Sequence, residues 1–173
     1  MSQALKGFIA NIKDVEIIVV EQLGNKKFNR GKLLNIGFKE SNEPDFVITH
    51  DVDLIPSNKL IKEKYTLTNF DALRIYSAHE KSLGGIVKLS KNSFIKANGF
   101  PNNIWGWGIE DRALYYRYSI LDLNISTNKF DDNLSEIYCI PHRKVWETYV
   151  GEKKEISDLE NTIFNESKKT DQR

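Results

Sequence analysis

The chain has 173 residues, of which 40% are hydrophobic and 28% are charged, and its formal net charge is +1. This composition predicts one soluble globular domain, and the near-neutral balance argues against nucleic acid or an anionic membrane as a partner. No stretch approaches the ~20 apolar residues of a membrane-spanning helix, and the single cysteine, Cys139, excludes an internal disulfide.

The first half of the chain alternates between helix and strand patterns. Apolar residues at helical spacing predict an amphipathic helix over the first dozen residues and a second helix over residues 29–40. Short β-branched runs at residues 15–20 and 46–49 predict buried strands. This order is typical of an α/β domain with a largely parallel sheet, in which ligands bind at the carboxyl ends of the strands.

The second half continues the pattern with shorter elements. We expect a strand at residues 85–89, a helix over residues 91–98 capped by Ser90, and a helix over residues 112–121. Two short strands follow, near residues 124–126 and 136–140. The domain is expected to span residues 1–146, and residues 147–173 form a charged C-terminal helix and tail.

The loop between the last two helices concentrates unusual residues. Trp105 and Trp107 are separated by one glycine and suggest a wall against which a flat ligand is held. Glu110 and Asp111 follow, in or just before the first turn of the next helix. Carboxylates are favoured there by the helix dipole alone, so this feature has a structural and a functional interpretation.

Three further patterns are candidates for binding. Asp51 and Asp53 follow a strand one residue apart, and on an extended chain their side chains share a face that suits a divalent cation and phosphate oxygens. The alternative is a solvated strand end. Cys139 and His142 have the C-x-x-H spacing of metal ligands, although a small buried hydrophobe and a surface histidine are the ordinary alternatives.

The third pattern is the start of the second helix. Phe28-Asn29-Arg30 places a guanidinium at a helix N-terminus, which is a natural site for a phosphate or carboxylate, with a ring beside it that can stack on a base. The alternative is an exposed arginine on an amphipathic helix. His50 and His79 are interpreted as structural.

Four motifs, in this order along the chain, resemble those of the β-1,4-galactosyltransferase family. They occupy residues 28–38, 50–56, 84–91 and 98–111, and His142 follows as the family's metal histidine does. The resemblance implies a GT-A fold, an α/β architecture with a mainly parallel central sheet flanked by helices. It also implies an inverting transfer of galactose or N-acetylgalactosamine from a UDP donor to a glycan hydroxyl.

The resemblance implies a role for each motif residue. Asp53, His142 and Cys139 match the manganese ligands, although the family has methionine in place of Cys139, and a thiolate favours softer ions such as zinc. Asp111 matches the catalytic base and Glu110 its acidic neighbour. The residues matching donor contacts are Phe28, Arg30, Asp51, Gly84, Gly85 and Trp107. The residues matching acceptor contacts are Trp107, Glu110 and Arg112.

Two substitutions relative to the family predict substrate preferences. Arg112 stands where the family has an acid that contacts the acceptor, which suits a negatively charged acceptor. Ser82 stands where the family has a larger residue, which leaves room for an N-acetyl group on the donor sugar. The acidic run after the tryptophans is shortened, with Ile109 in place of a glycine and Arg112 in place of the acid.

The family's domain begins with a further strand that grips the nucleotide, and this chain is expected to start after it, as an N-terminally truncated form. It is then a fragment, or it binds the nucleotide more weakly or by other means. The alternative function is therefore an inactive or weakly active glycan- or nucleotide-binding relic, and a metal-dependent hydrolase is more distant. Without the disulfides and Golgi anchor of animal members, we expect a cytoplasmic enzyme, soluble or peripheral at the inner membrane face, that builds a surface polysaccharide or lipid-linked glycan.

Overall fold

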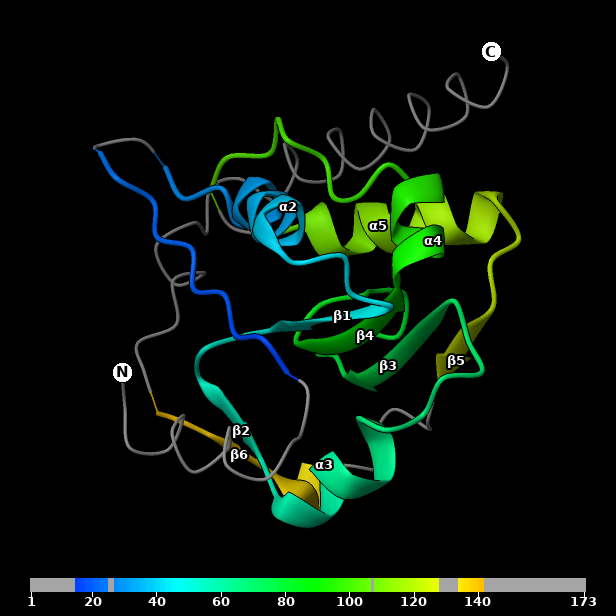
Figure 1. Ribbon diagram of the computed structural model, residues 1–173. Helices are drawn as coiled ribbons and strands as arrows, with labels where there is room; N and C mark the ends of the chain where they lie inside the picture. The colour runs from blue at the N-terminus through cyan, green and yellow to red at the C-terminus, as the bar shows by residue number, and fades with distance from the viewer. Residues whose placement is uncertain (1–14, 25–26, 107, 128–133, 142–173) are drawn as a thin grey trace.

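The computed structural model describes residues 15–24, 27–106, 108–127 and 134–141. The elements in chain order are α2 (Arg30–Glu40), β1 (Phe46–His50), β2 (Leu54–Pro56), α3 (Asn58–Lys64), β3 (Ala72–Tyr76), β4 (Ile86–Ser90), α4 (Lys91–Lys96), α5 (Glu110–Ile120), β5 (Ile125–Thr127), the 3-10 turn η1 (Leu134–Glu136) and β6 (Ile137–Cys139). Helices and strands are mixed along the chain (Figure 1), so the predicted α/β class is confirmed.

The main sheet has the strand order β1-β4-β3-β5, and β2 and β6 form a separate two-stranded ribbon. Within the main sheet β4 pairs antiparallel with both β1 and β3, and only β3 and β5 are parallel. The predicted mainly parallel sheet is therefore wrong for the described strands. β3 and β4 follow each other through a loop without a crossover helix, and such neighbours pair antiparallel.

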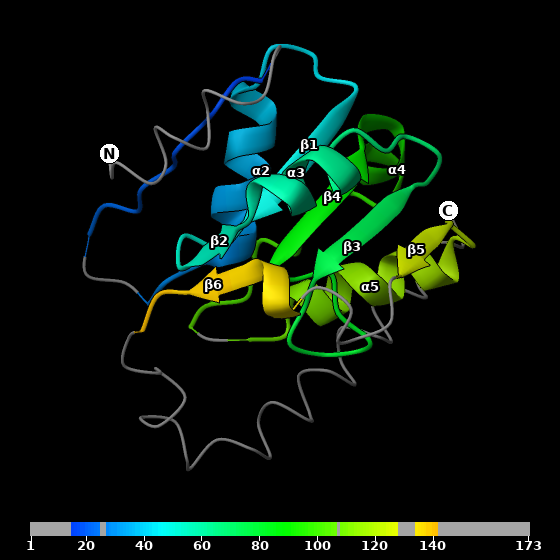
Figure 2. The ribbon, with the colours of Figure 1, turned by 90° about the horizontal axis from the view of Figure 1, so that it is seen from below.

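The predicted strand at residues 15–20 is also wrong, since the structure has no strand there. The segment runs beside α2 (Figure 2), where a Cβ on Gly37 would lie 3.4 Å from the Val20 side chain. Val15 and Val19 are exposed. The β-branched run therefore packs on a helix instead of in the sheet, which removes the strand that suggested a parallel βαβ unit.

Other predicted elements are confirmed with small shifts. The second helix, α2, begins after Asn29, whose side chain accepts a hydrogen bond from the Lys32 amide. Ser90 caps α4 by accepting from the Ser93 amide at 3.2 Å, but the helix ends at Lys96. The predicted first helix and C-terminal tail lie outside the described residues.

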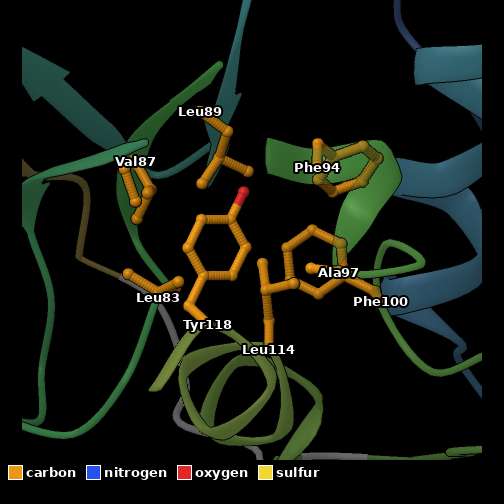
Figure 3. Close-up of a cluster of buried hydrophobic side chains, with 9 residues drawn as sticks. Leu83, Val87, Leu89, Phe94, Ala97, Phe100, Leu114 and Tyr118 are labelled. Carbon is orange, nitrogen blue, oxygen red and sulfur yellow. The ribbon is translucent and has the colours of Figure 1, made fainter. Parts of the chain in front are cut away.

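The main sheet has a hydrophobic cluster on each face. α2, α4 and α5 lie on one side of the sheet, and α3 lies on the other with the β2–β6 ribbon (Figure 1). Figure 3 shows Leu114 and Tyr118 of α5 meeting Phe94 of α4 and Val87 and Leu89 of β4. On the opposite face, the apolar side chains of α3 cover β3 and the start of β4.

This packing brings together the ends of two helices, the end of one strand and one loop. The N-termini of α2 and α5, the end of β1 and the loop before β4 all meet, as the contacts of Arg30, Glu110, Asp51 and Gly85 show. Burial of the two clusters, at ~25 cal/mol per Å² of apolar surface, holds these ends in place. The candidate site is built on them.

Candidate active site

Arg30 links two of the predicted acids. Its guanidinium donates to Asp51 Oδ1 from Nε at 2.9 Å and from Nη2 at 2.6 Å, and its Nη1 lies 3.4 Å from Glu110 Oε1. Arg30 is the first residue of α2 and Glu110 the first of α5. One guanidinium therefore fixes the positions of two carboxylates from separate elements.

The charges of this cluster are only partly balanced. Burial alone would lower the pKa of Arg30, but the carboxylates of Asp51 and Glu110 raise it above its ordinary value. Burial also raises the pKa of Glu110, and the neighbouring Asp111 adds to this rise, while Arg30 opposes it. Two adjacent acids beside one cation thus favour a proton on Glu110.

Asp51 is also held through its backbone. Its amide donates to the Gly85 carbonyl at 3.0 Å. Gly85 has a φ of +70°, and a Cβ there would lie 2.6 Å from the Tyr76 carbonyl oxygen. Only glycine suits this position, so the backbone that holds Asp51 passes close to Tyr76.

Asp111 occupies a second fixed position. The Ser82 hydroxyl donates to its Oδ2 at 2.7 Å, and the Arg112 amide donates to its Oδ1 at 2.7 Å. A Cβ on Gly84 would lie only 2.5 Å from Oδ2. Gly84 therefore leaves the space that this carboxylate fills, and fully buried Ser82 orients it.

Asp51 and Asp53 do not lie on an extended strand as predicted. The Leu54 amide donates to the Asp51 carbonyl at 3.2 Å, so the three residues form a turn between β1 and β2. Val52 is 93% exposed at its tip. The extended geometry is lost because β1 and β2 belong to different sheets. The two carboxylates bond to different side chains, Arg30 and Cys139, although both lie near enough to Tyr76 to raise its pKa.

Asp53 lies instead against the end of β6. The Ile140 amide donates to the Asp53 carbonyl at 2.7 Å, and the Cys139 thiol is 3.7 Å from Asp53 Oδ2. A carboxylate oxygen and a sulfur this close can reach one divalent ion. The predicted third ligand, His142, lies outside the described residues, and in the described part no three His, Cys, Asp or Glu side chains gather into a metal site.

The tryptophan loop is the segment of residues 98–109 between α4 and α5, and its described part lies next to the start of α2. The Gly106 amide donates to the Phe28 carbonyl at 2.7 Å, and Trp105 and Phe28 are both exposed. Arg112 is half-buried in the first turn of α5. Trp107, predicted to contact donor and acceptor, lies outside the described residues.

Sequence reasoning missed the asparagines of α2. Asn29 donates from Nδ2 to the Asn102 carbonyl at 2.8 Å, and Asn35 donates to the Phe100 carbonyl at 2.7 Å. Asparagine is unfavourable inside a helix, so Asn35 at an interior position of α2 was a usable signal. The His50 ring donates from Nδ1 to the Asp51 carbonyl at 2.9 Å, and burial lowers the pKa of His50.

Two adjoining family models match the chain. A model described as the N-terminal region of glycosyl transferase group 7 matches residues 5–66, and one described as the N-terminal domain of galactosyltransferase matches residues 65–143.

In the described part of the chain, no helix is both long and apolar enough to cross a membrane.

Curated relatives carry the same family name. Mouse β-1,4-galactosyltransferase 4 is 40% identical over 128 residues, which cover 68% of this chain and 37% of the relative. Human β-1,4-galactosyltransferase 6 is 33% identical over 165 residues, which cover 84% of this chain and 43% of the relative. The chain thus spans well under half of the length of these two relatives.

Solved structures agree with the sequence matches. A mutant Drosophila β-1,4-galactosyltransferase 7 in complex with manganese, UDP-Gal and xylobiose is 25% identical with a TM-score of 0.70, over 84% of this chain and 66% of that chain. The catalytic domain of the Drosophila enzyme with xylobiose has a TM-score of 0.69 at 25% identity, over 82% and 64% of the two chains. The fold is the GT-A type, and the chain belongs to the β-1,4-galactosyltransferase family.

Proposed function

We propose that the chain transfers galactose or N-acetylgalactosamine from a UDP donor to a glycan hydroxyl, with inversion and with Asp111 as general base. The observation that carries this proposal is the Asp111 carboxylate, fixed by Ser82 in the space left by Gly84 and adjacent to the Arg30–Asp51–Glu110 cluster. The family name of the relatives and the UDP-Gal, manganese and xylobiose in the neighbour structure support it.

Asp111 has the placement that a general base needs. Both of its oxygens accept a hydrogen bond, from Ser82 and from its neighbour's amide, so the carboxylate cannot rotate freely. As the acceptor hydroxyl attacks the anomeric carbon, its proton passes to an Asp111 oxygen and the bond to UDP breaks.

In this proposal the UDP-sugar donor is bound by the Arg30–Asp51–Glu110 cluster and by metal ligands beside the β2–β6 ribbon. Arg30 and Asp51 contact the donor, and Phe28 stacks on the base at the start of α2. Asp53, Cys139 and His142 would hold the divalent ion, which when bound neutralises the charge that grows on the leaving diphosphate. The sulfur of Cys139 extends the range of ions from manganese towards zinc.

Arg112 and Ser82 define the proposed preferences. A guanidinium beside the base favours an acceptor that carries a carboxylate, such as a uronate-containing glycan. A serine side chain at position 82 leaves more room for an N-acetyl group than a large residue does. Both donors and both acceptor types are therefore to be compared in one assay.

The test is a transfer assay on the purified chain with UDP-galactose and UDP-N-acetylgalactosamine, each with neutral and uronate-containing acceptors. Manganese, zinc and a chelator are compared in parallel. Metal-dependent product in at least one combination is expected, and a clear preference for neutral acceptors would rule out the role of Arg112. UDP binding without transfer would indicate a binding relic, and free sugar released without acceptor would indicate a hydrolase. The cytoplasmic location stays a prediction.

A further inference from the structure

The loop that carries the tryptophans is attached to α2 by one side chain in particular. Asn35 accepts from the Phe100 amide through Oδ1 at 2.9 Å and donates to the Phe100 carbonyl through Nδ2 at 2.7 Å. Its Nδ2 also lies 3.0 Å from Asn102 Oδ1. The Asn35 carboxamide thus pairs with both polar backbone groups of Phe100. In a sheet, a neighbouring strand would supply these two hydrogen-bond partners, and here one side chain supplies them.

The neighbouring backbone is shaped around this side chain. Gly99 has a φ of +58°, and a Cβ there would lie 2.5 Å from Asn35 Oδ1. One helical turn earlier, a Cβ on Gly31 would lie 2.8 Å from the Pro101 carbonyl oxygen. The loop therefore approaches α2 at backbone contact distance on both sides of Phe100, which is itself buried in the core.

A second set of contacts fixes the far end of the loop. Ile104 and Ile109 pack together with Ala113 of α5, and Ile109 directly precedes Glu110. Between these ends, the Gly106 amide reaches the Phe28 carbonyl. Since the described residues of this loop, 98–106 and 108–109, contain neither helix nor strand, these contacts and the bonds of Asn35 set where Trp105 and the start of α5 lie relative to Arg30.

We propose that Asn35 is a positioning residue, whose hydrogen bonds to Phe100 and Asn102 set the tryptophan loop and the Glu110–Asp111 pair against the Arg30–Asp51 cluster. This inference rests on the proposed transferase function. Asn35 touches no predicted substrate position and acts through the loop. It differs from a packing residue because its carboxamide acts through hydrogen bonds to the backbone of Phe100, whose side chain does the packing in the core.

The experiment uses amide hydrogen exchange by NMR together with transfer kinetics on the full chain. Asn35→Ala removes both bonds to Phe100, whereas Asn35→Asp keeps the acceptor for the Phe100 amide and loses the donors. Asn92→Ala is the matched control, since Asn92 is an exposed asparagine in α4. Exchange is followed at Phe100, at Gly106 and along β4.

For Asn35→Ala we expect faster exchange at Phe100 and also at Gly106, six residues away, with β4 unchanged. Transfer should fall about 10- to 100-fold, mainly in kcat, because small displacements of catalytic groups cost this much. Asn35→Asp should keep part of the Phe100 protection and recover part of kcat, and Asn92→Ala should match the wild type.

Three results would overturn the inference. They are faster exchange at Phe100 alone, a uniform rise that includes β4, and an unchanged kcat with a disturbed loop. If the wild-type chain transfers no sugar, the proposed function fails, and the exchange pattern alone then decides whether Asn35 positions the loop. The two failures are thus distinguishable.

Discussion

The two acids of the Asp51-Val52-Asp53 turn lie in different surroundings. Asp51 is paired with Arg30, in a cluster that includes Glu110 and is covered by α2 and α5. Asp53 lies on the β2–β6 ribbon with the Cys139 thiol at 3.7 Å from its carboxylate. The first acid is fixed by folding, and the second has the oxygen and sulfur neighbours that suit a metal ion.

This difference predicts that removing a charge from the Arg30 cluster mainly lowers the stability of the fold, whereas removing Asp53 mainly weakens the binding of an ion. A charge in the buried cluster cannot be removed without leaving its partners uncompensated. Asp53 is half-buried directly before β2, and its removal is expected to cost the fold less than the loss of the Arg30 charge, although the ion would lose a partner. The predictions below test both regions, starting with the largest expected effect.

Asp111→Asn should lower the transfer rate about 10³-fold, because a positioned general base contributes roughly 10²- to 10⁴-fold. Steady-state transfer assays measure this loss, and UDP binding in the presence of manganese should be retained. Asp122→Asn is the control, since Asp122 is exposed just after α5 at a φ of +51° that asparagine tolerates. More than a tenth of the wild-type rate in Asp111→Asn would exclude Asp111 as the base.

Arg30→Ala should lower the free energy of unfolding by about 2 kcal/mol, as measured by urea denaturation. Removing one partner of a fully buried ion pair costs about 3–5 kcal/mol, and the Asp51 side chain is 36% exposed, which reduces the loss. Lys32→Ala, at an exposed position on α2, should change the free energy by less than about 0.5 kcal/mol. Equal losses in the free energy of unfolding of the two variants would contradict the inference that Arg30 balances the charges of Asp51 and Glu110.

Ile109 tests the strain at the start of α5. It is buried with a φ of +68°, which is unfavourable for a β-branched residue. Both Ile109→Gly and Ile109→Ala lose the packing, but glycine adopts this backbone freely. The glycine variant should therefore be about 1 kcal/mol more stable than the alanine variant. The opposite order in thermal unfolding would show that the backbone is relaxed.

Glu110→Gln should remove one pH-dependent contribution to stability. Burial raises the pKa of Glu110 above its ordinary 4.5 in the folded chain, so the folded state binds this proton more tightly than the unfolded state does. The stabilisation is fully present below pH 4.5 and is lost as the pH rises through the folded pKa. The wild type should lose stability relative to the variant over that window in urea titrations, and parallel curves would contradict the raised pKa.

Asp53→Ala gives the smallest expected change in stability. Without metal, its free energy of unfolding should lie within about 1 kcal/mol of the wild type, because Asp53 is only half-buried. Urea denaturation in the presence of a chelator measures this value. A loss comparable to that of Arg30→Ala would remove the distinction between the two acids.

Local signals predicted much of the fold. The apolar spacing of α2 and the Ser90 cap of α4 depend on a few consecutive residues, and the structure has both of them. Residues 46–49 and 85–89 predicted β1 and β4 almost within their bounds. Strand direction depends on connections between distant segments, so the parallel sheet was not a safe conclusion from element order.

The site was predictable in its residues and less so in its geometry. The family motifs named Arg30, Asp51 and Asp111, and the structure pairs Arg30 with Asp51 and bonds Asp111 to Ser82. The roles of these residues stay predictions. The separation of Asp51 from Asp53 arises because β1 and β2 enter different sheets. The Ser82–Asp111 and Asn35–Phe100 hydrogen bonds join residues far apart in the sequence. No local sequence pattern predicts bonds of this kind.

The most direct test of the two roles is calorimetric titration of UDP into the wild type and Asp53→Ala, each with manganese and with a chelator. The account predicts that the wild type binds UDP only with manganese and that Asp53→Ala, although folded, binds it in neither condition. Manganese-dependent binding that survives in Asp53→Ala would contradict the assignment of the metal to the ribbon. Binding by the wild type in the chelator would show that the Arg30 cluster suffices without an ion.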